Sequence, residues 1–285
     1  MAYFSTVAII GPGLIGGSIG LALQKRRLAK RVVGIGRREE SLRLAENRRA
    51  VTDVTTNLEQ GLAEANLVIV CTPVQTVVEQ VVAAAKACQP HTLITDVGST
   101  KQAIVSGVDQ ALAGAQGLWA NFVGSHPLAG SERAGVEFAK EDLLEGRTVV
   151  VTPSDKTASG VADQMESFWR GLGAKTVRMS PHEHDAAVAQ TSHLPHLAAS
   201  ALAAATPEEL LPLTATGWAD ATRIAAGDSE LWRQILLENG SHVLKALAAF
   251  EKVLLDFRTA LESGDQAALT RLLRQGKYIR DSLGS

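Results

Sequence analysis

The sequence predicts a mainly parallel, doubly wound α/β sheet followed by an all-helical domain. Short β-branched runs alternate with helical stretches over roughly the first 180 residues, and only Ala- and Leu-rich helical segments follow them. Such alternation is typical of a parallel sheet that helices cover on both faces. We therefore expect two domains, residues 1–179 and 180–285.

The strands that the sequence predicts are marked by apolar, β-branched runs. They are expected at residues 6–10, 31–35, 67–71, 92–97, 121–126, 148–153 and 175–179. Cys71 closes the third run, and the two cysteines of the chain are too few for a disulfide framework, so both are expected to be chemically inert.

The composition excludes several classes of function. Of the 285 residues, 46% are apolar, which suffices for two cores, and the net charge of −2 provides no basic surface for nucleic acid. No apolar run approaches the ~20 residues that a membrane-spanning helix needs, and no signal-peptide pattern precedes the first strand. We expect a cytoplasmic protein that binds neither nucleic acid nor membranes.

A long helical stretch from Ser229 to Glu262 carries a narrow apolar seam. Its members follow one another at spacings of four and three residues: Val243, Leu247, Phe250, Leu254, Phe257 and Leu261. Such a seam is typical of helices that pack on other long helices. We expect the helical domain to form a homodimer, with an intramolecular bundle as the alternative.

The first predicted strand runs directly into a glycine-rich turn, TVAIIGPGLIGGSIG. Gly11, Gly13 and Gly16 form the pattern GxGxxG between a strand and a helix, the context of a Rossmann-type dinucleotide site. Leu14 and Ile15 open that helix, whose free N–H groups suit a pyrophosphate. Thr72 and Pro73 follow the third strand at the same sheet edge and are expected to flank the cofactor.

Two arginines follow the second predicted strand, where NAD-selective sites usually carry an acidic residue. The guanidinium groups of Arg37 and Arg38 suit a 2′-phosphate, so the sequence favours NADP as cofactor, with NAD possible. The alternative is that both arginines only cap or solvate the start of the next helix, beside Glu39 and Glu40.

Candidate catalytic residues follow the fourth and fifth strands. The segment DVGSTK carries Ser99 with Asp96 and Lys101, and the fifth strand ends in Ser125 and His126. An imidazole can take a proton from a substrate hydroxyl near neutral pH while a hydride leaves the same carbon. We expect His126 to be this base, Ser99 to hold the hydroxyl or orient the ring, and Ser125 to contact substrate.

The helical half supplies candidate substrate contacts. Its first helix contains TSHLPH, and TRIAAGDSELW brings Arg223 and Trp232. An arginine there suits a small carboxylate substrate, and the alternative is a surface ion pair with Asp220. The histidines near residues 182–196 lack the compact spacing of a metal site, so no metal is expected.

Seven segments together resemble the prephenate/arogenate dehydrogenase family of tyrosine biosynthesis. They are GPGLIGGSIGLAL, CTPV, DVGSTK, GSHPLAGSE, TSHLPH, TRIA with LW nine residues on, and LLENGSHVL. The resemblance implies a nucleotide-binding domain, a helical dimerisation domain and an oxidative decarboxylation. The ring hydroxyl is deprotonated as a hydride leaves the same carbon, and loss of carboxylate as CO2 makes the ring aromatic.

The resemblance also implies roles for individual residues. His126 is the base that bonds the 4-hydroxyl, Ser99 assists it, and Arg223 binds a substrate carboxylate. The side-chain pocket would be lined by Ser192, His196 and Trp232. Some arogenate-specific relatives lack a histidine where His196 stands, so its presence favours prephenate, with arogenate as the alternative substrate. A dinucleotide-sensing regulator without chemistry is a further alternative, which would need neither His126 nor Arg223.

Overall fold

A computed structural model describes residues 4–114, 121–130 and 133–284. The chain divides into two compact units, Met1–Asn239 and Gly240–Ser285. The boundary expected at residues 179/180 falls between the last strand, which ends at Arg178, and the helix that begins at Pro181. Helices on both sides of that boundary therefore belong to the first unit.

The first unit is built on a five-stranded parallel sheet with the order β3-β2-β1-β4-β5. Its strands are β1 (Phe4–Ile10), β2 (Ala29–Ile35), β3 (Asp53–Thr55), β4 (Leu67–Val70) and β5 (Leu93–Asp96). The chain reverses its direction of winding between β1 and β4, the position where ligands of such sheets bind. The short strand β3 was not expected from the sequence, because its three half-buried residues contain no apolar run.

Helices cover both faces of this sheet, as the doubly wound fold requires. In β1, Val7 and Ile9 belong to one core, together with side chains of α1 and α6, while Ala8 and Ile10 belong to a second core with α4 and α5. The helices of this region are α1 (Leu14–Lys25), α2 (Glu39–Asn47), α3 (Leu58–Leu62), α4 (Val74–Ala87), α5 (Gln102–Ala111) and α6 (Val161–Gly171). Burial on both faces explains the continuous apolar runs of the central strands.

A second sheet of three strands carries the His126 segment. It consists of β6 (Gly124–Pro127), β7 (Thr148–Thr152) and β8 (Lys175–Arg178), with β6 antiparallel and β8 parallel to β7. A single bridge between Ile94 and Phe122 links the two sheets. His126 lies within β6, opposite Val150, and the strand continues to Pro127 instead of ending at the histidine.

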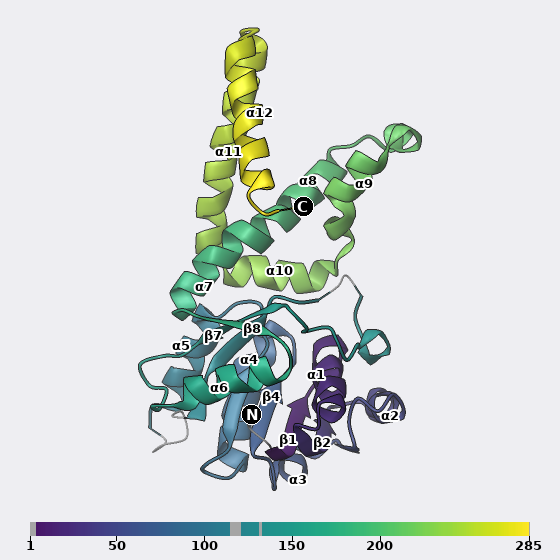
Figure 1. The fold of residues 1–285 in the computed structure, drawn as a ribbon, viewed down its shortest axis with the longest axis vertical. Coiled ribbons are helices and arrows are strands. Elements are labelled where there is room, and N and C mark those ends of the chain that lie inside the picture. Colours follow the sequence, from purple (N-terminus) through teal and green to yellow (C-terminus); the bar gives the residue numbers. More distant parts are fainter. Residues whose placement is uncertain (1–3, 115–120, 131–132, 285) are drawn as a thin grey trace. The chain divides into compact units, whose positions relative to one another are not determined.

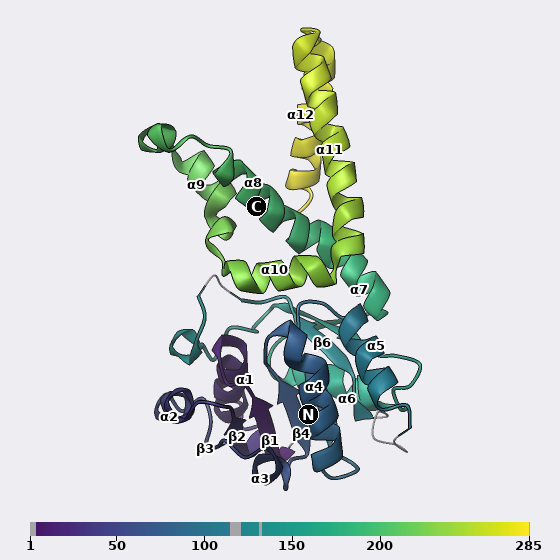
Figure 2. The same cartoon turned by 180° about the vertical axis from the view of Figure 1, so that it is seen from behind.

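Helices continue the first unit beyond the sheets. They are α7 (Pro181–Val188), α8 (Leu194–Ala204), α9 (Thr216–Thr222) and α10 (Ser229–Glu238). Figures 1 and 2 show α10 between the sheet region and the pair α8 and α9, and Ile235 of α10 joins the core that α4 covers. The helical stretch expected from Ser229 to Glu262 is in fact interrupted, because α10 ends at Glu238, before Asn239 and Gly240.

A π-helical turn, Ala189–His193, joins α7 to α8. Pro195 follows it and has no N–H to donate to the carbonyl of Thr191, four residues earlier, so an ordinary helical turn cannot close there. Instead, the N–H of Leu194 bonds the carbonyl of Ala189, five residues back. The turn falls within the TSHLPH segment.

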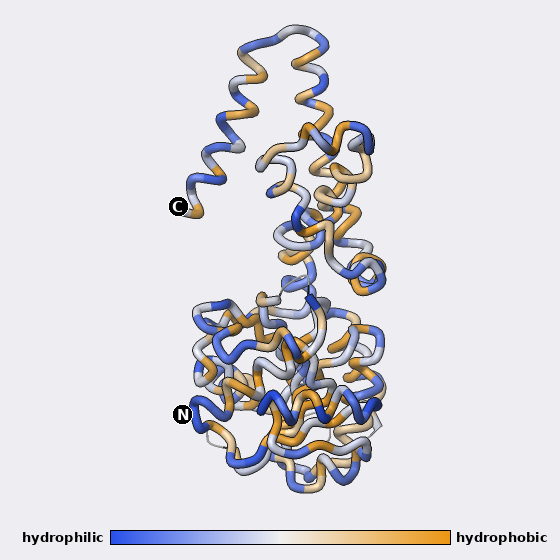
Figure 3. Tube along the Cα trace, turned by 90° about the vertical axis from the view of Figure 1, so that its right-hand side faces the viewer, coloured by the Kyte–Doolittle hydropathy of each residue, from blue (hydrophilic) through white to orange (hydrophobic). Residues whose placement is uncertain are grey.

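The second unit is a hairpin of two long helices, α11 (Gly240–Glu262) and α12 (Gln266–Asp281). Figure 3 shows apolar and polar residues alternating along both helices. Several large apolar side chains of the hairpin are exposed, among them Leu254 (51%), Leu261 (65%) and Leu273 (63%). The exposed positions include two members of the predicted seam.

Candidate active site

The glycine-rich turn lies where β1 and β4 end side by side. Gly11 has a φ of +85°, and a Cβ added to it would lie 2.9 Å from the carbonyl oxygen of Cys71. A Cβ added at Gly16 would lie 2.8 Å from the carbonyl oxygen of Gly11. A side chain is thus excluded at both positions by conformation or by backbone contact. At Gly13 the space around an added Cβ is open, which leaves room for a ligand.

The start of α1 is suited to bind an anion. Gly13 is its N-cap and has no side chain to accept the first N–H groups, and the first turn, which includes Leu14 and Ile15, has no acidic residue. Beside it, the hydroxyl oxygen of Thr72 is buried and has no hydrogen-bond partner within the described part of the chain. Pro73 is the N-cap of α4. These features fit the pyrophosphate of a dinucleotide.

Arg37 and Arg38 follow β2 and are both exposed. Arg38 is the N-cap of α2, while Glu39 of the same helix pairs with Arg43 at 3.2 Å. Within the described residues, neither Arg37 nor Arg38 forms an ion pair with Glu39 or Glu40. Arg38 thus stands at the start of the helix, as the alternative to NADP binding expects, while neither arginine is engaged by the two glutamates.

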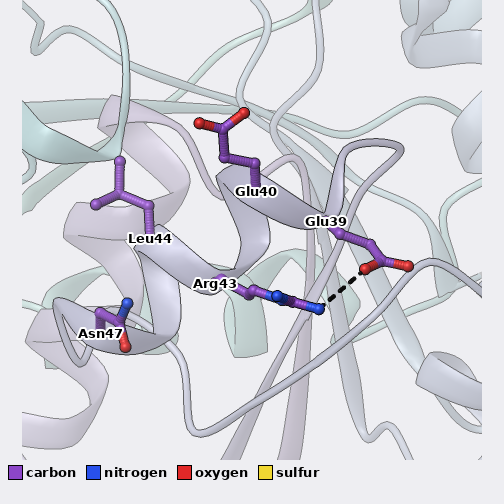
Figure 4. A pocket seen from close by; sticks show the side chains of 5 residues that line it. All are labelled: Glu39, Glu40, Arg43, Leu44 and Asn47. Atoms are coloured by element: carbon purple, nitrogen blue, oxygen red, sulfur yellow. Dashed lines mark hydrogen bonds and ion pairs between the residues drawn. The ribbon is translucent and has the colours of Figure 1, made fainter.

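A hollow on α2 lies beside these arginines. Figure 4 shows its lining side chains, which are Glu39, Glu40, Arg43, Leu44 and Asn47. All five residues belong to α2, and two of them, Glu39 and Arg43, form an ion pair with each other. The hollow contains none of the predicted catalytic or substrate-binding residues.

The ends of β5 and β6 are joined by a buried polar network. The fully buried ammonium group of Lys101 pairs with the carboxylate of Asp96, which also accepts a hydrogen bond from the backbone N–H of Ser125 at 3.3 Å. The hydroxyl of Ser125 accepts hydrogen bonds from Thr95 at 2.9 Å and from the indole of Trp169 at 3.0 Å. Ser125 thus faces the interior, and its predicted substrate contact stays a prediction.

His126 is hydrogen-bonded to a second histidine that the sequence interpretation assigned no catalytic role. Its Nδ1 lies 2.8 Å from Nε2 of His184, whose Nδ1 lies 2.7 Å from the carboxylate of Asp185. Burial holds the pKa of His126 well below its ordinary value, and the His184 ring and the Lys101 ammonium act in the same direction. The imidazole of His126 is therefore neutral near pH 7 and able to accept a proton.

Ser99 is half-buried in the loop between β5 and α5. The next residue, Thr100, donates a hydrogen bond of 2.6 Å to Glu238 of α10. The loop that carries Ser99 is thus tied to the helix that carries Trp232. Ser192 is half-buried in the π-helical turn.

His196 and Trp232 form one flat stack. Their ring centroids are 3.5 Å apart with an interplanar angle of 11°. A Cβ added at Gly227 would lie 2.7 Å from the indole nitrogen of Trp232 and 3.1 Å from the ring of His196, so the chain approaches the stack closely there. Burial lowers the pKa of His196, whose Nδ1 has no hydrogen-bond partner among the described residues.

Arg223 begins the short 3₁₀ helix Arg223–Ala226, which packs on α8, and its side chain is exposed. In the described part of the chain it makes no ion pair, with Asp220 or with any other acidic residue. The charge is thus available to a ligand, although no hydrogen bond connects Arg223 to the His126 network.

Sequence interpretation missed Asp185 and the pairing of His184 with His126. The available signal was the dipeptide His184–Asp185 itself, because a histidine near a carboxylate often forms a hydrogen-bonded pair. From the sequence, His184 was expected at most to be a metal ligand. Across the described residues, no group of three or more His, Cys, Asp or Glu side chains is arranged to hold a metal ion.

Two further observations concern the chain as a whole. Burial raises the pKa of the Cys71 thiol, which lies under the glycine-rich turn, and that of Cys88. Both thiols are therefore protonated and unreactive near neutral pH. None of the helices that the structure describes is long and apolar enough to cross a membrane. The last two residues of GSHPLAGSE, positions 131 and 132, lie outside the described part of the chain.

Two family models together match most of the chain. The nucleotide-binding domain of prephenate dehydrogenase matches residues 19–178, and the dimerization domain of prephenate dehydrogenase matches residues 180–275.

Individual proteins are similar over nearly the whole length. A prephenate dehydrogenase of Bacillus subtilis is 38% identical over 98% of this chain and 76% of its own length. A cyclohexadienyl dehydrogenase of Zymomonas mobilis is 31% identical over 99% and 97% of the two chains.

Solved structures agree with these similarities. Prephenate dehydrogenase from Aquifex aeolicus, in complex with hydroxyphenyl propionate and NAD⁺, has a TM-score of 0.89 and 30% identity over 98% of each chain. Synechocystis arogenate dehydrogenase has a TM-score of 0.82 and 29% identity over 98% of this chain and 99% of its own.

Proposed function

Because the chain belongs to the prephenate dehydrogenase family, we propose that it catalyses the NAD(P)-dependent oxidative decarboxylation of prephenate to 4-hydroxyphenylpyruvate, a step of tyrosine biosynthesis. The observation that supports this most directly is the neutral His126 imidazole, held through Nδ1 at the junction of the two sheets. The proposal includes a functional division at residues 179/180 and a cytoplasmic location.

His126 supplies the acid–base chemistry in this proposal. A nicotinamide cofactor held at the glycine-rich turn would supply the hydride acceptor for C4 of the substrate. His126 removes the proton of the 4-hydroxyl, so that a C4 carbonyl forms as the C4–H bond breaks. The electron pair of the C1–carboxylate bond then enters the ring as CO2 leaves, and the phenolate oxygen recovers its proton from His126. Ser99, in the loop after β5, contacts the same hydroxyl.

The helical part of the first unit binds the rest of the substrate. Arg223 binds a carboxylate, and the stack of His196 on Trp232 forms a wall of the side-chain pocket with Ser192 beside it. The unpaired Nδ1 of His196 supports a polar role there, since a buried polar atom without a partner is costly. A neutral imidazole suits the keto-acid end of prephenate, and arogenate would present an ammonium group instead.

We further propose NADP as the preferred cofactor. Gly11, Gly13 and Gly16, the start of α1 and Thr72 would hold the pyrophosphate. Arg37 and Arg38 would hold the 2′-phosphate. The support is that both guanidinium groups are exposed and free of ion pairs with described residues, while Glu39 is neutralised by Arg43.

The second unit is proposed to form a homodimer interface. Leu254, Leu261 and Leu273 expose large apolar surfaces on the hairpin, and a second copy would cover them. Sedimentation equilibrium should give twice the chain mass at micromolar concentration. A monomer at that concentration would remove the homodimer from the proposal.

One assay matrix tests the function as a whole. Prephenate and arogenate are each combined with NADP⁺ and NAD⁺, and the formation of reduced nicotinamide is followed by its absorbance. Prephenate with NADP⁺ should give the highest kcat/KM. A preference for arogenate would reassign the substrate, and a preference for NAD⁺ by tenfold or more would reassign the cofactor. No turnover of either substrate would leave a dinucleotide-sensing regulator.

A further inference from the structure

His184 and Asp185 lie on the buried side of α7, directly behind His126. The helix begins at a defined point, because Ser180 and Glu183 form a reciprocal capping box and Pro181 occupies the first turn. His184 is 0% and Asp185 3% exposed, so both side chains are sealed from water. A buried carboxylate beside two imidazoles is costly unless every one of its bonds is satisfied.

The carboxylate of Asp185 is satisfied by three donors. Its Oδ1 accepts hydrogen bonds from the N–H of Lys101 at 2.7 Å and from Nδ1 of His184 at 2.7 Å, and its Oδ2 accepts one from the N–H of Gln102 at 2.9 Å. Burial raises the pKa of Asp185, but these hydrogen bonds outweigh it and lower the pKa overall. Asp185 is therefore ionised and can only accept hydrogen bonds.

An ionised Asp185 determines the position of every proton along the chain of rings. Since the carboxylate cannot donate, Nδ1 of His184 carries a proton, and in the uncharged form of that ring Nε2 carries a lone pair. The 2.8 Å bond between Nε2 of His184 and Nδ1 of His126 then requires His126 to be the donor. The remaining nitrogen of His126, Nε2, is left with its lone pair.

We propose that His184 and Asp185 are positioning residues that hold His126 as the Nδ1–H tautomer, with Nε2 as the basic atom, and that stabilise the ring once it takes the substrate proton. This inference rests on the proposed function, in which His126 is the base. The pairing of the charges leaves Asp185 facing the rings: Asp96 pairs with the Lys101 ammonium, while the Asp185 carboxylate is bonded to His184 at the far end of the two rings.

A third histidine, close to the network, does not disturb this arrangement. Nδ1 of His193 lies 3.1 Å from the side-chain nitrogen of Asn239, which also donates to the backbone oxygen of Asp185 at 2.8 Å. Burial lowers the pKa of His193 to about 4, so that ring is neutral as well. Asn239 thus supports the network from outside the carboxylate–imidazole–imidazole chain.

The tautomer of His126 is measured directly by nitrogen NMR on ¹⁵N-histidine-labelled enzyme without substrate, at a pH where the rings are neutral. The chain has seven histidines, and the signal of residue 126 is assigned by its loss in His126→Asn. The wild type should show a protonated Nδ1 and an unprotonated Nε2 at His126. In His184→Phe, which removes the acceptor, the signals should move towards the Nε2–H tautomer that predominates in water.

Kinetic measurements on the same variants distinguish a positioning role of His184 from a purely structural role. His184→Phe should lower kcat for prephenate by roughly a hundredfold or more while KM changes little, since a wrong tautomer disables the base without removing a substrate contact. His184→Gln, whose carbonyl can still accept from Nδ1 of His126, should recover part of kcat. Asn239→Ala, which removes a neighbouring buried hydrogen bond, is the control for loss of packing and should keep the His126 tautomer.

Two failures are distinguishable. An Nε2–H tautomer in the wild type, or full turnover by His184→Phe, overturns the positioning role whatever the substrate is. An Nδ1–H tautomer combined with full turnover by His126→Asn instead overturns His126 as the base, and with it the proposed mechanism.

Discussion

The imidazole of His196 lies flat against the indole of Trp232, 3.5 Å between centroids. The stack fixes the ring plane of His196 and therefore the direction of its nitrogens. A flexible amide at this position would lose that orientation. In the proposed function, this single aromatic contact would orient the residue that meets the substrate side chain.

His196→Asn should raise the KM for prephenate by about tenfold or more, because a hydrogen bond to a charged group contributes about 1.5–3 kcal/mol. The KM for NADP⁺ should not change. Trp232→Phe, which keeps a flat ring beside His196, is the matched variant and should have a smaller effect. An unchanged KM for prephenate in His196→Asn would exclude His196 as a substrate contact.

His126→Asn should fold and bind cofactor but lose roughly 10²–10⁴-fold in kcat, the usual contribution of general base catalysis. Initial rates measure the loss, and thermal unfolding together with cofactor titration checks the fold. In the wild type, kcat/KM should fall only when the pH drops below the ordinary histidine range, because the depressed pKa keeps His126 unprotonated there. Wild-type rates in the variant would eliminate the mechanism.

Arg223→Ala should raise the KM for prephenate by roughly ten- to a hundredfold, as expected for a lost charge-assisted anion contact. Cofactor affinity should change much less. Arg223→Lys keeps the charge but not the planar, bidentate geometry, so its KM should lie between those of the wild type and the alanine variant. If KM stays constant, the carboxylate is bound elsewhere.

The double variant Arg37→Ser, Arg38→Ser should have a KM for NADP⁺ that is roughly ten- to a hundredfold higher, with a nearly unchanged KM for NAD⁺. Arg43→Ser is the single-residue control, because Arg43 lies on the adjoining helix but is paired with Glu39. Equal losses with both cofactors would mean that Arg37 and Arg38 do not select the 2′-phosphate.

The stability of the fold should rise with pH between about 4 and 6.5. In this window the unfolded chain protonates His193, whose ordinary pKa is 6.5, while burial keeps the folded ring neutral down to about 4. The contribution of His193 to the free energy of unfolding is therefore fully present above pH 6.5. It decreases as the pH falls towards 4, by at most about 3 kcal/mol. Urea unfolding measures it, and His193→Asn, which keeps an acceptor for Asn239, should reduce the slope. An unaltered slope would contradict the assignment.

Local signals in the sequence predicted the cofactor turn and most of the strands. The glycine pattern is recognisable because Gly11 and Gly16 are required by backbone geometry within one turn. β3 escaped prediction because Asp53–Thr55 has no apolar run. The antiparallel pairing of β6 with β7 was not predicted either. An apolar run indicates that a strand forms, but it does not indicate whether the neighbouring strand is parallel or antiparallel.

The hydrogen-bond network of His126 was predicted only in part, for a related reason. His126 was identified through its surrounding motif, but its hydrogen-bond partner His184 lies 58 positions further along the chain. The sequence alone does not indicate which histidines come into contact when they are so far apart along the chain. The donors that hold the Asp185 carboxylate are the backbone N–H groups of Lys101 and Gln102 at the start of α5, and such backbone groups leave no trace in the pattern of side chains.

The π-helical turn Ala189–His193 sets how the side chains of α7 are rotated about the helix axis relative to those of α8. Each residue of an α-helix advances by about 100° around the helix axis. The extra residue of the turn therefore determines which directions the side chains of α8 face relative to those of α7. With this offset, His184 and Asp185 face the sheets while His196 faces Trp232. Removing one residue from the turn would leave both helices intact yet rotate one surface by about a quarter of a circle away from the other.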